Sequence, residues 1–143
     1  MSVYADTSFV VSLYTLDANS VAAAGYMHRA RLPFLITPLG ELELRNALHL
    51  RLFRRELEET EVRAAESLFQ VDLAAGVFAM KPLPVAAFER AKKIAHIRTP
   101  ELGTRTIDVL HVASALVLRA NTFCTFDRQQ RTLAKTEKLN TPV

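Results

Sequence analysis

The sequence contains a single cysteine among its 143 residues, at position 124. An internal disulfide is therefore excluded, and so low a cysteine content is typical of a reducing compartment. No uninterrupted apolar run reaches the ~20 residues that a membrane-spanning helix requires. No basic stretch leads into an apolar run near the N-terminus, so no secretion signal is visible. We therefore expect a cytoplasmic protein with no membrane association.

The chain also lacks linkers, internal repeats and low-complexity tracts. Half of its residues are hydrophobic, which excludes extended disorder. A chain of 143 residues has the length of about one domain and can bury one core. We expect a single domain over residues 1–143, with Cys124 filling a buried strand rather than acting as a nucleophile.

Short apolar segments alternate with helical patterns along the chain. We expect strands at residues 3–5, 34–37, 77–80 and 123–126, and helices near 7–14, 21–30, 38–53, 60–74, 84–97, 107–119 and 128–135. The polar residues 98–106 predict a loop, and the last residues predict a short edge strand. Strands separated by helices favour an α/β fold with three layers, in which helices cover both faces of a central parallel sheet of four or five strands.

Four acidic side chains lie at the edges of apolar segments or within them: Asp6, Glu43, Asp108 and Asp127. Two of them close expected strands and two lie in expected helices. Functional groups of a parallel sheet gather at the carboxyl ends of its strands, where acids from strands and helices can meet. A pocket of carboxylates suits a divalent cation, because oxygen ligands select hard ions such as Mg²⁺. The sequence has no Cys/His spacing typical of a zinc site.

Each acid also has a structural interpretation. Asp6 and Asp127 can cap the helices that follow them. Asp108 can lie in a first helical turn, where negative charge is favoured, and Glu43 can pair with Arg45. The apolar residues on both sides of Glu43 and Asp108 weaken this interpretation.

Three segments carry a resemblance to a known family. They read YADTSFVVSLY, ITPLGELELRNAL and RTIDVLHVASALVLRANTFCTFDRQQRTLA. In order and spacing they resemble the signature stretches of the PIN-domain nucleases, and the pattern Asp-x-x-His-x-Ala followed by Thr-Phe-Asp is the most specific part. The resemblance is closest to small members such as the VapC-type toxins of toxin–antitoxin pairs.

The resemblance implies an endoribonuclease in which an acidic quartet holds Mg²⁺ or Mn²⁺ and a metal-activated water hydrolyses RNA. The matching positions are Asp6, Glu43, Asp108 and Asp127. The family further implies that nearby hydroxyls order the metal shell or its water, here those of Thr7, Ser8 and Thr125. It also implies a homodimer and a small antitoxin protein that blocks the cleft.

Other side chains near the acids need separate interpretation. Glu41 competes with Glu43, but residues two apart on a helix point about 200° away from each other, so only one can face the site. The spacing after the expected strand favours Glu43. His111, one helical turn after Asp108, is interpreted as a packed structural histidine. The candidates for phosphate contacts, each equally well explained as solvated surface, are Arg105, Arg128 and Arg131.

Repulsion within the quartet predicts a measurable property. Two carboxylates ~4 Å apart repel by roughly 4 kcal/mol at an effective dielectric constant near 20. Without metal, we therefore expect raised pKa values for the acids. Two other function classes stay open: a PIN-like fold that has lost its chemistry and only binds RNA or protein, and a phosphotransfer or receiver domain. The second needs an Asp-x-Asp pair or a lysine after a late strand. Asp6-Thr7-Ser8 lacks the second Asp, and no lysine follows Asp127 before Lys135.

Overall fold

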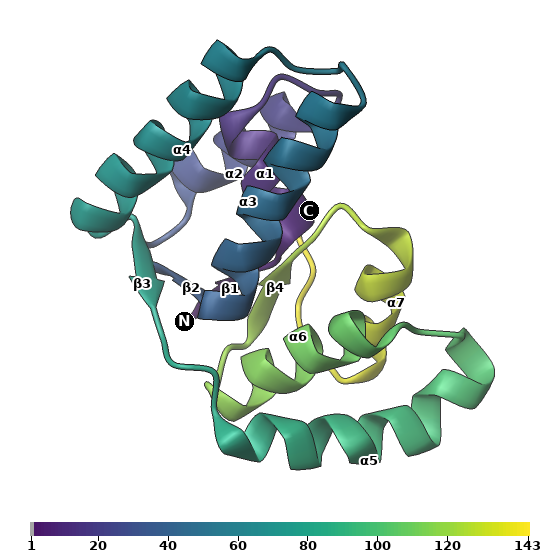
Figure 1. Cartoon of the computed structure of the whole chain (residues 1–143). Coiled ribbons are helices and arrows are strands. Elements are labelled where there is room, and N and C mark those ends of the chain that lie inside the picture. The colour runs from purple at the N-terminus through teal and green to yellow at the C-terminus, as the bar shows by residue number, and fades with distance from the viewer. Residues whose placement is uncertain (1) are drawn as a thin grey trace.

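The structure is a computed structural model that describes residues 2–143 (Figure 1). Its four described strands form one parallel sheet in the order β3-β2-β1-β4. The strands are β1 (Val3–Ala5), β2 (Phe34–Ile36), β3 (Phe78–Met80) and β4 (Thr122–Cys124). The helices are α1 (Thr7–Tyr14), α2 (Ser20–Arg29), α3 (Pro38–Phe53), α4 (Glu59–Ala74), α5 (Val85–Leu102), α6 (Thr106–Val117) and α7 (Arg128–Thr136).

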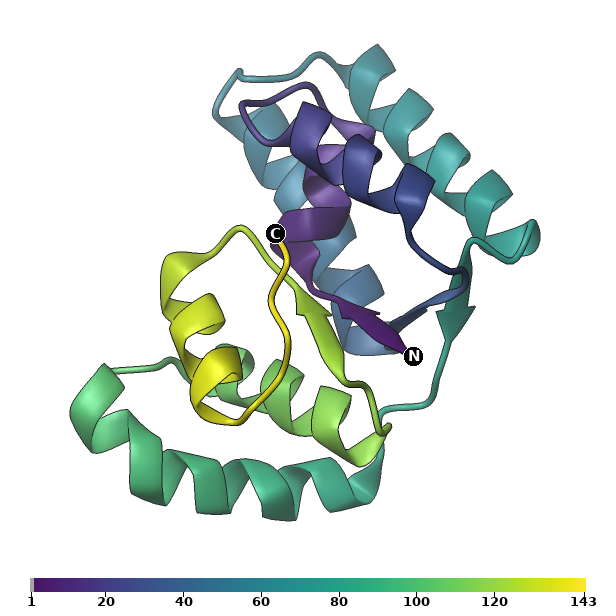
Figure 2. The ribbon, with the colours of Figure 1, turned by 180° about the vertical axis from the view of Figure 1, so that it is seen from behind.

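The sheet separates two hydrophobic cores. Successive side chains of a strand point to opposite faces, so Val3 and Ala5 of β1 join one core while Tyr4 between them joins the other. Helices α1 to α4 cover the first face and α5 to α7 cover the second (Figures 1 and 2). The expected α/β architecture with three layers is confirmed.

Helix α6 is the most deeply buried helix on the second face. Its residues 108 to 115 are all buried, and they include Asp108, His111 and Ser114 among apolar neighbours. The apolar pattern of the sequence predicts this central position. Within residues 2–143, no helix is both long and apolar enough to cross a membrane.

The loop expected at residues 98–106 is largely wrong, because α5 continues to Leu102 with Pro100 inside it. Pro100 lies in the last turn, where its ring removes a single backbone donor from the helix. The helix ends at Gly103, whose φ of 62° is left-handed, and the Gly103 N–H donates to the Thr99 carbonyl. Glycine adopts this conformation without a Cβ penalty. Only residues 103–105 form the connection to α6.

The fourth strand is shorter than expected and the predicted edge strand is absent from the described chain. Strand β4 ends at Cys124, so the next two residues belong to a loop. The C-terminal segment runs beside β4 (Figure 2), yet it forms only an isolated bridge between Asn140 and Thr122. Three backbone hydrogen bonds attach it. They run from Phe123 N to Asn140 O (2.8 Å), from Asn140 N to Asn121 O (2.9 Å) and from Thr125 N to Val143 O (3.3 Å).

Candidate metal and nucleic-acid site

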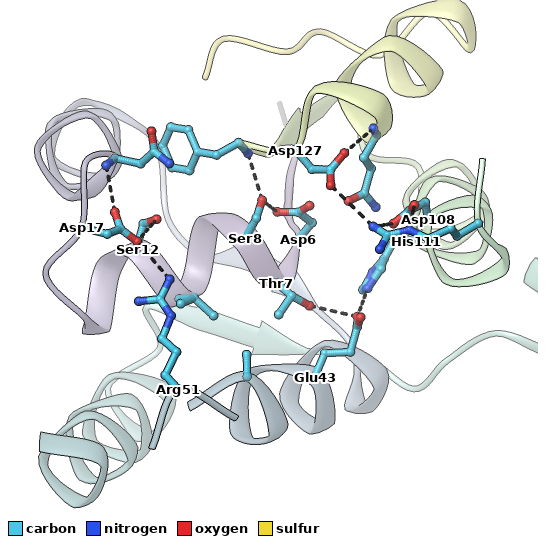
Figure 3. A pocket seen from close by; sticks show the side chains of 16 residues that line it. Asp6, Thr7, Ser8, Ser12, Asp17, Glu43, Arg51, Asp108, His111 and Asp127 are labelled. Atoms are coloured by element: carbon cyan, nitrogen blue, oxygen red, sulfur yellow. Dashed lines mark hydrogen bonds and ion pairs between the residues drawn. The ribbon is translucent and has the colours of Figure 1, made fainter. Parts of the chain in front are cut away.

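A pocket of about 440 Å³ opens at the carboxyl ends of β1 and β4. All four acids singled out in the sequence line it, although they come from different elements (Figure 3). Asp6 lies between β1 and α1, Glu43 on α3, Asp108 in the first turn of α6, and Asp127 directly before α7. Folding therefore brings residues more than 100 positions apart to one cavity.

Asp6 is buried and fully hydrogen-bonded. Its Oδ1 accepts from the Phe9 N–H (3.0 Å) and from the Ser8 hydroxyl (2.8 Å), and its Oδ2 accepts from the Thr125 hydroxyl (2.7 Å). The structural interpretation as a cap of α1 is therefore correct, and the same carboxylate also lines the pocket. Burial raises the pKa of Asp6, and the hydrogen bonds from Thr125, Phe9 and Ser8 only partly offset this effect.

Two of the expected hydroxyls join the loop after β4 to α1. The Ser8 and Thr125 hydroxyl oxygens lie 3.2 Å apart, and Ser8 Oγ accepts from the Phe126 N–H (2.9 Å). Thr125 Oγ1 accepts in turn from the Asp127 N–H (3.1 Å). Asp127 caps α7 by accepting from the Gln130 N–H (2.9 Å). The orientation of Asp127 is therefore set by the same network that holds Asp6.

Glu43 faces the pocket from α3. Its Oε1 accepts from the Thr7 hydroxyl (2.9 Å) and pairs with Nε2 of the buried His111. His111 Nδ1 lies 2.7 Å from the Tyr4 hydroxyl on the opposite side of the ring. Glu41 instead pairs with Arg45 at 3.3 Å on the same helix, as expected from its different direction. His111 is packed and hydrogen-bonded as predicted, but it also lines the pocket.

The expectation of raised pKa values is wrong for Glu43. Partial burial by itself would raise the pKa of Glu43. The hydrogen bond and charge of His111, together with the hydrogen bond from Thr7, outweigh this effect of burial, so the net result is a lowered pKa. The expectation considered only repulsion among carboxylates. In the structure Glu43 has His111 as a partner, whereas the hydrogen-bond partners of Asp6 are neutral. The pKa of Asp6 is raised as expected, but burial and not repulsion between carboxylates is the cause.

Arg105 lies across two of the acids. Its Nε is 3.0 Å from Asp108 Oδ2, and its Nη2 is 3.6 Å from Asp127 Oδ2. The Arg105 side chain is 71% exposed, whereas that of Asp108 is only 7% exposed. A solvent-exposed cation therefore neutralises two carboxylates that converge from α6 and from the start of α7.

The donor set of the pocket fits a hard divalent cation. The carboxylate and hydroxyl oxygens are the ligands that Mg²⁺ and Mn²⁺ prefer. The positive charge of Arg105 already lies between the carboxylates of Asp108 and Asp127, where a metal ion could lie instead. As the side chains of residues 2–143 lie, no three carboxylates, imidazoles or thiols converge closely enough to hold an ion. Arg105 lies between Asp108 and Asp127, and His111 pairs with Glu43. An ion shared by Asp108 and Asp127 would have to displace Arg105.

The PIN domain sequence profile matches residues 3–136. The chain belongs to the PIN domain family. A search of curated proteins finds no match. Three solved structures share the fold of this PIN domain at 15–16% sequence identity. VapC20 from Mycobacterium tuberculosis, a toxin that cleaves the sarcin–ricin loop, is 16% identical with a TM-score of 0.71, and the match covers 92% of this chain and 94% of that one. FitAcB from Neisseria gonorrhoeae is 15% identical with a TM-score of 0.68, and the match covers 97% of this chain and 95% of that one. PAE2754 from Pyrobaculum aerophilum is 16% identical with a TM-score of 0.64, and the match covers 99% of this chain and 89% of that one.

The three candidate phosphate contacts lie in different surroundings in this PIN domain. Arg105 lines the pocket, whereas Arg128 and Arg131 do not belong to its lining. Arg131 Nη2 donates to the Thr125 carbonyl oxygen (2.9 Å), so this guanidinium fastens the loop after β4. Arg128 is exposed on α7. Of these three arginines, only Arg105 has the position that a phosphate contact in this pocket requires.

Sequence reasoning missed the half of the pocket that lies away from Asp108. Arg51, Asp17 and Ser12 line this part (Figure 3). A signal existed in the sequence: Glu43 and Arg51 lie eight residues apart on one helix, so they share a face. That spacing acquires meaning only once Glu43 is known to face the pocket.

Proposed function

We propose that this PIN domain is a metal-dependent endoribonuclease that hydrolyses RNA phosphodiester bonds. The observation that carries the proposal is the convergence of four acids from separate elements on one pocket, with Arg105 bridging two of them. Membership of the PIN family supports it. A phosphotransfer or receiver domain has no corresponding support.

The chain's own residues would hold Mg²⁺ or Mn²⁺ through Asp6, Asp108 and Asp127, with Glu43 completing the quartet. Such an ion, when bound, lowers the pKa of a water and neutralises charge that develops on the phosphate. Ser8 and Thr125 fix the direction of the Asp6 carboxylate. Thr7 and His111 do the same for Glu43. Ligands held in this way need little reorganisation when a substrate binds.

Arg105 has two successive roles in this proposal. Without an ion, its guanidinium neutralises Asp108 and Asp127. When an ion takes over that task, the exposed side chain is free to contact a phosphate of the RNA. A guanidinium suits this contact because its donors match two phosphate oxygens at once.

We further propose that the protein is the toxin of a toxin–antitoxin pair and acts in the cytoplasm. The likeness in fold to VapC20, which is itself a toxin, supports this assignment. A small antitoxin protein and a second copy of the chain are the partners we propose. Large apolar side chains of α3, among them Leu42 (64% exposed) and Phe53 (83% exposed), offer a surface for such partners.

Purified protein incubated with a structured RNA tests the proposal. We expect cleavage in the presence of Mn²⁺ or Mg²⁺ and none after a chelator removes the ion. Fragments separated on a denaturing gel give the rate. RNA binding that does not depend on the ion, without any cleavage, would instead favour an inactive binding module.

Substituting Arg105 by alanine is expected to raise the affinity for Mn²⁺ about two- to fivefold, because exposed ion pairs that the metal must replace contribute about 0.4–1 kcal/mol. Titration calorimetry with Mn²⁺ and no RNA measures this effect. Arg128→Ala removes the same charge from an exposed position outside the pocket. Equal affinities of the two variants would show that Arg105 does not compete with the ion.

A further inference from the structure

The pocket is longer than the acidic site requires. Its lining continues from Glu43 through Ala47 to Arg51, which lie four residues apart along α3. Side chains at this spacing share one helix face, and eight residues correspond to a rise of about 12 Å. Figure 3 shows Arg51 and Asp17 at one end of the pocket and Asp108 at the other. The pocket is therefore an elongated groove with the four acids of the quartet toward one end, here called the acidic end, and the Asp17–Arg51 pair at the other.

Arg51 is held in a fixed position at the far end. Its Nη1 donates to the Thr15 hydroxyl (2.8 Å), and its Nη2 lies 3.5 Å from Asp17 Oδ2. A guanidinium carries five N–H donors, so these two contacts leave donors available. Its side chain is 28% exposed. Arg51 is thus a cation held ready for a further anionic ligand.

Asp17 pairs with Arg51 and stays charged. Its carboxylate accepts from the Asn19 N–H (2.8 Å) and the Ser12 hydroxyl (2.9 Å). Partial burial raises the pKa of Asp17, but these hydrogen bonds, with Ser20 and the Arg51 charge, lower it below its usual value. The pair Asp17–Arg51 therefore exists at neutral pH.

The lining of the groove also includes apolar side chains, here called the apolar floor. They are Val11, Ala47 and Phe126, and Ala47 lies between Glu43 and Arg51 on α3. Such a surface suits a ribose or an unpaired base, because single-stranded RNA presents its bases for stacking and apolar contact. An ion held at the acidic end would attract one phosphate, the apolar floor suits a nucleoside, and Arg51 would attract another phosphate. This order corresponds to the alternation of phosphates and nucleosides along one RNA strand.

We propose that Arg51 binds a second phosphate of a single-stranded RNA segment, further along the strand from the phosphate at the acidic end, with the intervening nucleoside portion on the apolar floor. This inference rests on the proposed nuclease function. It assigns the groove to a strand that extends beyond the cleaved bond in the direction of α2. Arg51 is then a residue that binds the substrate without touching the reacting atoms.

A series of single-stranded RNA substrates that differ by one nucleotide at either end tests the proposal with Mn²⁺ present. For the wild type we expect KM to fall at one added nucleotide, the one whose phosphate reaches Arg51. We call this fall in KM the step. In Arg51→Ala the step is expected to disappear, so that KM for the longer substrates is about tenfold higher than in the wild type, the effect of losing a hydrogen bond to a charged group. The value of kcat and the KM of the shortest cleaved substrate should stay near those of the wild type.

Two further variants separate phosphate binding from a structural role. Arg54→Ala removes an exposed arginine near the end of the same helix and should keep the step in KM. Asp17→Asn breaks the ion pair but leaves Arg51 in place, so it should keep or deepen the step. If Asp17→Asn loses the step as Arg51→Ala does, Arg51 only ties α3 to the loop before α2, and the subsite is refuted.

The proposed function and the subsite can fail separately. A wild-type protein that cleaves no RNA overturns both together. Cleavage with a step in KM that persists in Arg51→Ala overturns only the subsite. Should Arg51→Ala not fold, as shown by circular dichroism, Asp17→Asn decides alone, because a freed Arg51 must then bind the longer substrates at least as tightly as the wild type does.

Discussion

Replacing Asp108 by asparagine is expected to lower kcat/KM for RNA cleavage about 10²- to 10³-fold, since several kcal/mol of transition-state stabilisation depend on the ion that this carboxylate holds. The carboxylate projects from a buried position in α6 and contacts Arg105. The amide has nearly the same shape, so the surrounding helix is preserved while the negative charge is lost. Cleavage rates measured with Mn²⁺ at a fixed RNA concentration test this.

Glu41→Gln is the matched control for Asp108→Asn. It removes one carboxylate from α3, two residues from Glu43, where the side chain pairs with Arg45 instead of lining the pocket. We expect its rate to stay within about twofold of the wild type, because surface substitutions away from a site change energies by only ~0.5 kcal/mol. If the two variants cleave equally fast, Asp108 has no part in catalysis and the nuclease proposal loses its basis.

Adding Mn²⁺ to a hundred times its dissociation constant is expected to raise the melting temperature at pH 7 by roughly 5–10 °C, because binding stabilises the native state by ~2.7 kcal/mol. At low pH the shift should shrink, since protons compete for the carboxylates. Thermal melts at several pH values, with and without the ion, measure both effects. A melting temperature that does not respond to Mn²⁺ or Mg²⁺ contradicts the metal site.

The pH dependence without metal has two opposing parts. The folded-state pKa of Asp6 is raised, so its contribution to stability grows as pH falls through that raised range and is lost as pH rises again. The folded-state pKa of Glu43 is lowered, so its contribution is present at neutral pH and is lost as pH falls. The difference between wild type and a variant of Asp6 isolates the first part.

Asp6→Asn provides that difference. An asparagine oxygen can still accept from the Phe9 N–H and cap α1, but the buried charge is gone. We expect a higher melting temperature than the wild type at neutral pH without metal, a smaller dependence on acid pH, and loss of most of the Mn²⁺ shift. An unchanged Mn²⁺ shift in Asp6→Asn would remove Asp6 from the ligands.

The positions of the acids could be predicted because they follow from chain periodicity. A parallel sheet places Asp6 at the end of β1 whatever side chains surround it. The spacing of apolar residues in α6 likewise fixes the turn on which Asp108 lies. The family resemblance added the assignment of Asp6, Glu43, Asp108 and Asp127 to a single catalytic quartet.

The partners of the acids could not be predicted, because they depend on side-chain directions between elements. Nothing in the sequence near Arg131 indicates that its guanidinium turns inward to the Thr125 carbonyl. The lowered pKa of Glu43 depends on His111, which lies 68 residues further along the chain. The end of α5 was predicted too early, because a proline in the last turn of a helix gives the same local pattern as a proline in a loop.

The two cores on opposite faces of the sheet have a mechanical consequence. Asp6 and Glu43 belong to the half built around α1 to α3, whereas Asp108 and Asp127 belong to the half built around α6 and α7. The chain of contacts from Tyr4 through His111 to Glu43 fastens these halves across the seam. The affinity for the ion should therefore depend on how rigidly the two halves are joined. A substitution that creates a cavity in either core should weaken ion binding at temperatures below the melting temperature.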